Sequence, residues 1–502
     1  MAAMKAYPVA LDQPTVPFNQ FFRYGIASCH AYLTLREDFR SHVRRIQRDI
    51  GFHGIRFHGI FDDEVGAVHY APCRFIDSDG GPQLNFQNII RVYRFFVEQG
   101  MTPFVELGFM PDQLASGTKT CFAYKGNVTP PKDFTQWGRL VRRFAAQMVE
   151  TFGLDEVRRW HFEVWNEPDL SYFWTGSQAD YFRLYAESAK AVKSVDAKLK
   201  VGGPATSGCK WIGETIDFCK KEHLPLDFIS THDYCTNSAL ALDGQRSEMR
   251  WGGGPQRMYE SVARVRATVD SSAFPKAEVH FTEWNATAAH GDRFGKDSEF
   301  TAAFVLDTLK RVNGLVDSYM FWTISDIFEE SGLSLKPFTG KYGLVNCDGV
   351  PKPVFHAFRW MAMLYDEEII AGTPEWCRVT RGPKGELRVL AWNLPEVEKM
   401  DTTGGDWTLK AAARRENLLL KPLRGRFKVV THGVDAQRGN AMRAWQKMGS
   451  PAYPTLEQIA TLHSAAEATV IGETMIESDG GGLTLPLDLP PCRALFCDIA
   501  PV

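Results

Sequence analysis

The feature that most constrains the fold of this chain is an alternation that spans approximately residues 20–365. Short apolar runs rich in β-branched and aromatic residues are separated by longer stretches with apolar residues at helical spacing. In one unit, Phe39 and Val43 begin a helical stripe, and Gly51 is suited to end that helix. A strand-like run follows at 54–60. Repeated units of this kind are typical of a parallel sheet covered by helices.

Eight runs of this kind are expected to be strands. They cover 23–28, 54–60, 102–107, 161–168, 199–204, 226–232, 278–285 and 317–323. Eight strands with intervening helices predict an α/β fold, a closed (β/α)8 TIM barrel, rather than an open doubly wound sheet. No GxGxxG motif follows a strand and no GxxxxGK[ST] motif occurs, which argues further against a nucleotide-binding fold.

The chain is expected to hold a second domain, because single cores stop growing at roughly 250–300 residues. Beyond the barrel, runs such as 387–392 and 483–489 alternate or are apolar between Gly and Pro turns, which is typical of an antiparallel β-sandwich. We therefore predict a catalytic barrel over 15–365. The accessory β-sandwich is predicted over 1–14 and 366–502, with the N-terminal residues adding a strand to it.

Charge and composition exclude several classes of partner. The formal net charge is −3, so neither nucleic acid nor an anionic membrane is expected to be attracted to the chain. No apolar run reaches transmembrane length and the N-terminus lacks the apolar segment of a secretory signal, so we expect a cytoplasmic protein. The ten cysteines show no CxxC motif and no clustering with histidines at metal spacing. We therefore expect no metal and no other cofactor.

Two glutamates lie where the reacting groups of such a barrel are found, at the C-terminal ends of strands. Glu167 closes the fourth predicted strand before Pro168, and Glu283 closes the seventh. A barrel brings these strand ends to the same rim. Hydrolysis of an acetal requires one carboxylic acid to protonate the leaving oxygen and a second carboxylate to meet the anomeric carbon from the opposite face. The pair therefore predicts a glycosidase, with Glu167 as acid/base and Glu283 as nucleophile.

Arg56 is expected to make the two carboxylates unequal. It shares one face of the second predicted strand with His58, because side chains alternate along a strand. If that face is the barrel interior, the arginine charge would keep Glu283 ionised, while the bulk of Trp165 and the opposing negative charge would raise the pKa of Glu167. Glu163 lies one layer deeper in the strand and is interpreted as a buried partner of a basic group.

The strand-end motifs together resemble those of glycoside hydrolase family 39 of clan A, the family of β-xylosidases and α-L-iduronidases. The matching segments are Ser-Cys-His-Ala (28–31), Ile-Arg-Phe-His-Gly-Ile-Phe-Asp-Asp (55–63), Phe-Val-Glu-Leu-Gly-Phe-Met-Pro (104–111), Phe-Glu-Val-Trp-Asn-Glu-Pro (162–168), Ile-Ser-Thr-His-Asp-Tyr (229–234), Phe-Thr-Glu-Trp-Asn (281–285) and Phe-Trp-Thr-Ile-Ser-Asp-Ile-Phe-Glu-Glu (321–330). The resemblance covers the whole predicted barrel. It implies a retaining double displacement with a glycosyl-enzyme intermediate.

The resemblance also implies a set of sugar-binding residues. Asn166 would bond the sugar 2-hydroxyl beside the acid/base, and the other residues expected at the substrate are His58, Phe173, His232, Tyr234, Trp322 and Glu329. Aromatic faces stack on sugars, while carboxylate, amide and imidazole groups bind hydroxyls. Packing explains Phe173 equally well, and both histidines are also compatible with a supporting role in the barrel. Glu329 and Glu330 are adjacent and cannot both point into one pocket.

The most specific function that follows is an exo-acting β-xylosidase that hydrolyses short xylo-oligosaccharides. Alternatives on the same scaffold are a β-galactosidase, an endo-acting enzyme or an α-L-iduronidase-like enzyme, which would need a cation such as Arg293 or Lys336 for the uronate carboxylate. A non-catalytic carbohydrate-binding protein is a further alternative. A metal-dependent barrel hydrolase would need His-x-His after the first strand, which Cys29-His30 does not supply. Assembly into a homo-oligomer is left open.

Overall fold

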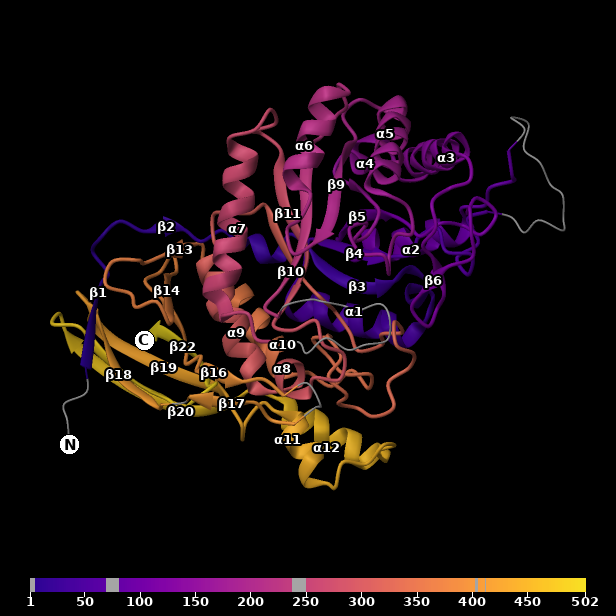
Figure 1. Cartoon of the computed structure of the whole chain (residues 1–502). Coiled ribbons are helices and arrows are strands. Elements are labelled where there is room, and N and C mark those ends of the chain that lie inside the picture. Colours follow the sequence, from indigo (N-terminus) through magenta and orange to yellow (C-terminus); the bar gives the residue numbers. More distant parts are fainter. Residues whose placement is uncertain (1–4, 69–80, 237–249, 402–404, 411) are drawn as a thin grey trace.

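The computed structural model describes residues 5–68, 81–236, 250–401, 405–410 and 412–502. A barrel of strands surrounded by helices lies beside a smaller, mostly β domain (Figure 1). The first and last strands of the described chain, β1 (Lys5–Ala10) and β22 (Ala494–Pro501), lie in that smaller domain (Figure 1). The prediction of a (β/α)8 barrel with an accessory β domain is confirmed.

Eight parallel strands close the barrel, and chain order is also spatial order, so that the last strand pairs with the first. The strands are β3 (Ile26–His30), β4 (Gly54–His58), β5 (Thr102–Leu107), β8 (His161–Val164), β9 (Lys200–Ser207), β10 (Phe228–Tyr234), β11 (Glu278–Asn285) and β12 (Ser318–Phe321). Each overlaps a strand expected from the sequence. All eight carboxyl ends therefore meet at one rim.

Helices cover the outside of the barrel. They are η1 (Phe21–Arg23), η2 (Ala31–Leu35), α1 (Glu37–Asp49), α2 (Gln87–Glu98), α3 (Phe134–Phe152), α4 (Leu154–Val157), α5 (Gln178–Val195), α6 (Ile212–Lys221), α7 (Gly254–Asp270), α8 (Arg293–Asp297), α9 (Glu299–Arg311) and α10 (Pro353–Met363). Local chemistry sets their starts: Ser177 and Asp180 form a capping box before α5, and the Asp133 side chain accepts from the Thr135 backbone before α3. A short hairpin of β6 (Thr120–Cys121) and β7 (Gly126–Asn127) lies in the loop after β5.

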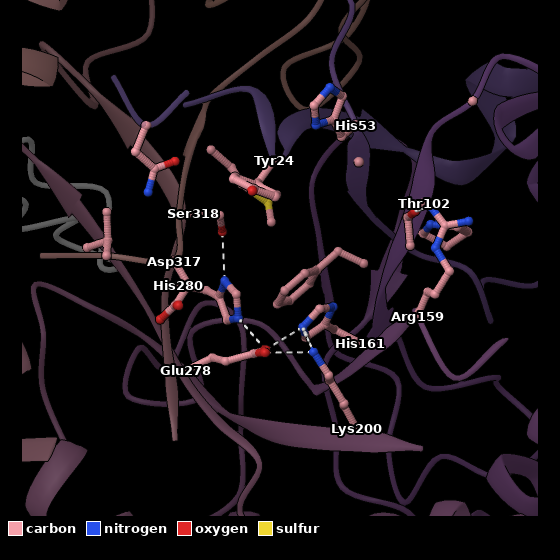
Figure 2. Close-up of a pocket in the computed structure, with 17 residues that line it drawn as sticks. Tyr24, His53, Thr102, Arg159, His161, Lys200, Glu278, His280, Asp317 and Ser318 are labelled. Carbon is pink, nitrogen blue, oxygen red and sulfur yellow. Dashed lines mark hydrogen bonds and ion pairs between the residues drawn. The ribbon is translucent and has the colours of Figure 1, made fainter. Parts of the chain in front are cut away.

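The two ends of the barrel differ. A cavity of about 430 Å³ lies at the C-terminal rim and includes Glu167 and Glu283. A second cavity, of about 620 Å³, lies among the N-terminal ends of the strands, where His161, Glu278 and His280 gather (Figure 2). Because reacting groups of these barrels gather at the C-terminal rim, the smaller cavity is the candidate for catalysis.

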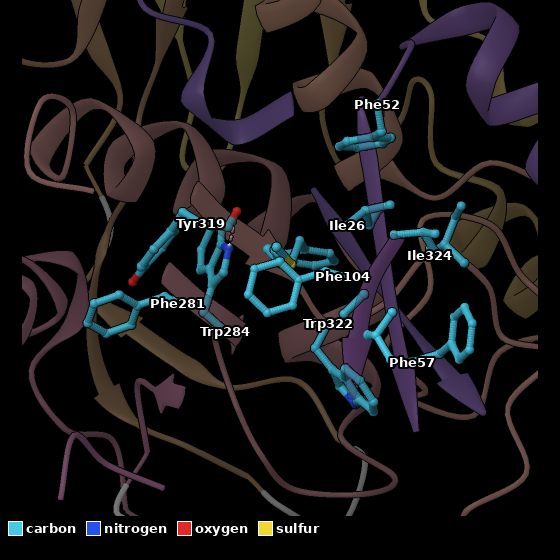
Figure 3. Close-up of a cluster of buried hydrophobic side chains, with 14 of the residues drawn as sticks. Ile26, Phe52, Phe57, Phe104, Phe281, Trp284, Tyr319, Trp322 and Ile324 are labelled. Carbon is cyan, nitrogen blue, oxygen red and sulfur yellow. Dashed lines mark hydrogen bonds between the residues drawn. The ribbon is translucent and has the colours of Figure 1, made fainter. Parts of the chain in front are cut away.

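Side chains of the barrel strands alternate between the helices and the interior. Phe57 faces outward, and its ring centroid lies 5.6 Å from the ring centroids of both Tyr93 and Phe96 on α2. Its neighbour Arg56 is fully buried inside the barrel. The outward side chains join a continuous apolar cluster, part of which is shown in Figure 3. This core, together with the inward polar residues, holds the strand ends in place.

The accessory domain consists of two packed sheets and two helices. One sheet has the order β1-β18-β21, and the other β2-β13-β14-β15-β22-β19-β20. Its elements are β1 (Lys5–Ala10), β2 (Val16–Pro17), β13 (Glu367–Glu368), β14 (Cys377–Arg381), β15 (Leu387–Trp392), β18 (Arg414–Lys421), β19 (Arg424–Val434), α11 (Ala441–Lys447), α12 (Leu456–Ala466), β20 (Thr469–Asp479), β21 (Leu483–Leu489) and β22 (Ala494–Pro501). A separate hairpin is formed by β16 (Glu396–Lys399) and β17 (Thr408–Lys410).

Strand β1 pairs in parallel with β18, so the N-terminal residues do enter an accessory sheet. Residues of β2 pair with β13, although they lie just inside the range assigned to the barrel from the sequence. The division at 15 and 366 therefore stays a prediction. Among the described helices, none has both the length and the apolar character needed to span a membrane.

Candidate active site

Glu167 follows β8 at a point where the backbone leaves regular geometry. Trp165 and Glu167 both have positive φ, 70° and 41°, which is uncommon for residues other than glycine and often occurs at functional sites. Trp165 is fixed by an indole N–H that donates to the Phe173 carbonyl at 2.8 Å. The turn places both Asn166 and Glu167 on the wall of the cavity.

Glu283 reaches the cavity because β11 contains an irregularity. Thr231 of β10 pairs with Phe281 but His232 pairs with Glu283, so one residue of β11 is skipped. Thr282 consequently shares the interior with Glu283, its hydroxyl donating to Glu163 at 2.8 Å. Bulges of this kind re-aim side chains next to active sites. In a regular strand, Thr282 and Glu283 would face opposite sides.

The two glutamates converge. An oxygen of each carboxylate and a His232 nitrogen all lie within 4.8 Å of one another. Nδ1 of His232 lies 2.9 Å from Oε1 of Glu167, and its distance to Oε2 of Glu283 is 3.7 Å. Two acids this close at the mouth of one cavity can act on a single bond of a bound molecule.

Arg56 lies beneath the pair and contacts them unequally. Its Nη1 donates to Oε1 of Glu283 at 2.6 Å, its Nη2 to Oδ1 of Asn166 at 2.9 Å and its Nε to Oε2 of Glu163 at 2.7 Å. Tyr234 donates its hydroxyl to the second oxygen of Glu283 at 2.7 Å. Glu283 is thus bound by a cation and a phenol, whereas no arginine contact to Glu167 is found in the described part of the chain.

Burial and nearby charges give the two carboxyl groups different pKa values. Burial, followed by the Glu283 and Asp169 carboxylates, raises the pKa of Glu167 well above its usual range. Burial also raises the pKa of Glu283, but Arg56, His58 and the Tyr234 hydrogen bond all act to lower it. The environment therefore favours a protonated Glu167 beside an ionised Glu283.

His58 is a neutral base at the cavity floor. Burial lowers its pKa to about 3. Its Nδ1 lies 2.6 Å from Glu106, whose own pKa is raised by burial to about 7. The other ring nitrogen faces Glu283 at 3.6 Å and Glu330 at 3.7 Å. A bound hydroxyl group placed there can interact with all three side chains.

The structure brings most of the sequence-predicted residues to this cavity. Those that line it are His58, Asn166, Glu167, Phe173, Tyr234, Glu283 and Trp322. His232 is fully buried behind Glu167 rather than on the cavity wall. The expectation for Glu329 is not met, because its carboxylate is held by Arg36 at 2.7 Å and His30 at 3.2 Å outside the cavity. Its neighbour Glu330 lines the cavity instead.

Several lining residues carry no signal in the sequence. Phe122 comes from the turn between β6 and β7, and His290 and Tyr342 come from loops after β11 and β12. Loop positions show neither strand parity nor a strand end, so sequence periodicity has no means of placing them. Glu106 is different, since it lies on the interior face of β5 and strand parity alone could have identified it.

The sequence and the fold are both similar to those of known glycosidases. The family model described as glycosyl hydrolases family 39 matches residues 7–480. A β-xylosidase of Caldicellulosiruptor saccharolyticus is 38% identical over 458 residues, 89% of each chain. A β-xylosidase of Geobacillus stearothermophilus is 35% identical over 470 residues, 92% of this chain and 89% of that protein. The crystal structure of a monomeric β-xylosidase from Caulobacter crescentus CB15 superposes with a TM-score of 0.90 at 31% identity, covering 99% of this chain and 100% of that one.

Proposed function

Because the chain belongs to glycosyl hydrolases family 39 and is a glycoside hydrolase, we propose that it is a retaining, exo-acting β-xylosidase that releases xylose from short xylo-oligosaccharides. The observation that carries the retaining mechanism is the convergence of Glu167 and Glu283, whose carboxylate oxygens approach within 4.8 Å. Retaining enzymes hold their carboxyl groups about 5–5.5 Å apart, whereas inverting enzymes leave about 6.5–9.5 Å for a water molecule.

Each glutamate has one role in this mechanism. The Glu283 carboxylate attacks the anomeric carbon while Glu167 gives its proton to the leaving oxygen, and a glycosyl ester on Glu283 results. Glu167, now ionised, removes a proton from water, which displaces Glu283 and restores both groups. Asn166 is held by Arg56 through its carbonyl oxygen, which leaves the amide oriented so that its NH₂ group can donate to the sugar 2-hydroxyl.

The size and lining of the cavity favour a single xylosyl unit. Its volume of about 430 Å³ is at the low end of small-molecule pockets, which span roughly 300–1,000 Å³. Phe122, Phe173 and Trp322 supply aromatic faces, and Glu330 and His58 supply groups for hydroxyls. Digestion of xylotetraose tests exo action: xylose and xylotriose are expected as the first products, whereas xylobiose alone would show internal cleavage.

The lining argues against a uronidase. Among the described residues that form the cavity wall there is no lysine or arginine, and neither Arg293 nor Lys336 belongs to it. The Glu330 carboxyl group would instead meet a uronate carboxylate. Rates on 4-nitrophenyl glycosides test the sugar preference. The β-xyloside is expected to be the best substrate, and a clear preference for an iduronide or a galactoside would overturn the assignment.

Substitution of the two glutamates tests their roles. Glu283→Ala is expected to abolish nearly all turnover and to let azide form a glycosyl azide of opposite anomeric configuration. Glu167→Ala should preserve kcat/KM for substrates with good leaving groups, because these need little protonation. If Glu167→Ala is equally damaging for every leaving group and azide rescues neither variant, the assignment of roles is wrong.

A further inference from the structure

The second cavity lies at the opposite end of the barrel from Glu167 and Glu283. It has a volume of about 620 Å³ and is lined by residues at the N-terminal ends of the strands. His161 begins β8, Glu278 begins β11, and His280 is two residues further along β11 (Figure 2). Strands β9 and β10 lie between these two, so the cluster spans part of the barrel floor. The proposed glycosidase mechanism uses none of these side chains.

Three potential ligand atoms meet in this cavity. Oε2 of Glu278 lies 2.7 Å from Nε2 of His161 and 3.2 Å from Nε2 of His280, and the three atoms are all within 4.8 Å of one another. The His161 ring is stacked at 4.8 Å on Phe104, and Nδ1 of His280 contacts the Ser318 hydroxyl at 2.8 Å. A hydrogen bond to the far ring nitrogen, such as that of His280, orients histidines that bind metals.

The three side chains offer the donors that suit a cation entering from the cavity. The imidazoles supply nitrogen and Glu278 supplies carboxylate oxygen, and divalent transition-metal ions bind both kinds of ligand. All three residues line the cavity. The side chains of His161 and Glu278 are 15% and 31% exposed, so an ion can reach them.

We propose that His161, Glu278 and His280 form a binding site for one divalent transition-metal ion of the Zn²⁺ or Ni²⁺ type. Two imidazoles and one carboxylate are a common ligand set for Zn²⁺ and related ions. Hard ions such as Mg²⁺ prefer oxygen ligands and would bind poorly here. Water in the cavity would complete the coordination shell of the ion.

Lys200 competes with the ion. Its Nζ lies 2.6 Å from Oε1 of Glu278 and 3.4 Å from Nε2 of His161, so in the metal-free chain the ammonium group supplies the positive charge. The side chain is 33% exposed and can turn toward solvent. Binding must displace it or overcome its repulsion. Removing this charge should therefore tighten metal binding.

The consequence of binding concerns stability rather than turnover. The ion would join the starts of β8 and β11, and a ligand that binds the folded state alone raises its stability. The catalytic pair lies at the other rim, so kcat/KM should not change. This inference is independent of the proposed sugar specificity, because binding is measured without substrate.

The test is titration calorimetry of the full chain with ZnCl₂ and NiCl₂, with MgCl₂ for comparison. We expect one saturable site for Zn²⁺ and an increase in Tm when it is filled. His161→Ala and His280→Ala should each weaken binding by at least about tenfold. Lys200→Met should tighten it. His53→Ala is the matched control, because His53 lines the same cavity outside the cluster and its loss should leave affinity unchanged.

Three results would overturn the proposal. The first is the absence of saturable Zn²⁺ binding in both the unaltered chain and Lys200→Met. The second is undiminished affinity in His280→Ala. The third is loss of binding in Glu283→Gln, which would place the ion among Glu167, His232 and Glu283 at the other rim. Failure of sugar hydrolysis in the unaltered chain would contradict the proposed function and would leave this site standing.

Discussion

Arg56 explains how two glutamates in one cavity come to differ. It is fully buried and its charge is shared among Glu106, Glu163 and Glu283. A buried charge of this kind persists only when it is paired and hydrogen-bonded. Since Arg56 contacts Glu283 directly, the ionised form of that residue is stabilised and Glu167 is left to carry the proton.

The first residue-scale prediction concerns pH. A general acid works in its protonated form, so kcat/KM is expected to be high below the raised pKa of Glu167 and to fall as pH rises through it. In Glu167→Gln this alkaline limb should disappear, because the group that titrates is gone. The measurement is the pH profile of kcat/KM on phenyl β-xyloside, whose poorer leaving group needs protonation. A limb that survives the substitution would assign the titration to another group.

The second residue-scale prediction concerns Tyr234, whose hydroxyl donates to Glu283. Hydrogen bonds to charged groups contribute about 1.5–3 kcal/mol, so Tyr234→Phe should lower kcat/KM by about 10- to 100-fold. The acid limb of the pH profile should move to higher pH, because the lost bond favours the carboxylate.

Tyr342→Phe is the matched control for this variant. Tyr342 lines the same cavity but donates its hydroxyl to the Ala288 carbonyl at 2.7 Å. The acid limb of the pH profile of Tyr342→Phe should therefore stay at the same pH as in the unaltered chain. An identical displacement of the limb in both variants would show that the hydroxyl of Tyr234 has no special effect on Glu283.

Residues at strand ends were predictable and residues in loops were not. Glu167 and Glu283 follow from their positions at strand ends on the rim of a barrel, and Arg56 follows from strand parity. The choice between Glu329 and Glu330 depends on how an irregular loop turns after β12. Arg36 and His30, both distant in sequence, decide it by binding Glu329.

At the scale of elements, the hairpin β16–β17 joins the accessory domain to the wall of the active site. Trp407 packs against Phe294 at 5.6 Å, and its indole N–H donates to Asp292 at 3.1 Å. Asp292 is the N-cap residue of α8 and lies in the loop that also supplies Ala288 and His290 to the cavity. The hairpin therefore positions that loop from outside the barrel.

Trp407→Phe tests this positioning role. The change removes one of two hydrogen bonds to Oδ1 of Asp292, which still accepts from the Gly295 N–H, and it also reduces buried packing. A loss of about 1–3 kcal/mol in the free energy of unfolding is therefore expected, with a higher KM for 4-nitrophenyl β-xyloside. Trp376→Phe is the control, because Trp376 packs against Tyr7 within the accessory sheets. It should affect stability with KM unchanged. Equal KM values in the two variants would contradict the role of the hairpin.

The regular elements of the barrel were predictable because helices and strands repeat with distinct periods. The short elements were not: β6, β7 and α8 contain only a few residues each, too few for a period to appear. Their positions depend on contacts such as that of Trp407, which link residues far apart in the chain. The bulge in β11 was not predictable either, because it arises from pairing with β10, which is distant in the sequence.

At the scale of the whole molecule, the accessory sandwich is completed by the start of the chain. Strand β1 covers one edge of β18, and Val9 is fully buried with Leu11 nearly so. Burial of a side chain of this size contributes about 1.5–3 kcal/mol. The N-terminal strand therefore ties the beginning of the chain to residues more than four hundred positions away.

Deletion of residues 1–11 is expected to lower Tm and to destabilise the accessory sandwich. A chain that lacks only residues 1–4 keeps β1 and is the control. Thermal unfolding followed by circular dichroism provides the measurement. If both deletions leave Tm unchanged, β1 contributes nothing to the stability of the sandwich.

The central claim is that Glu283 forms a covalent bond to the sugar while Glu167 handles the proton. The most direct measurement is the mass of proteolytic peptides after incubation with 2,4-dinitrophenyl 2-deoxy-2-fluoro-β-xyloside, in which dinitrophenolate leaves and the fluorinated sugar is retained. One fluoroxylosyl group on the peptide that contains Glu283 is the predicted result. A label on Glu167, or an active enzyme that never becomes labelled, would contradict the mechanism.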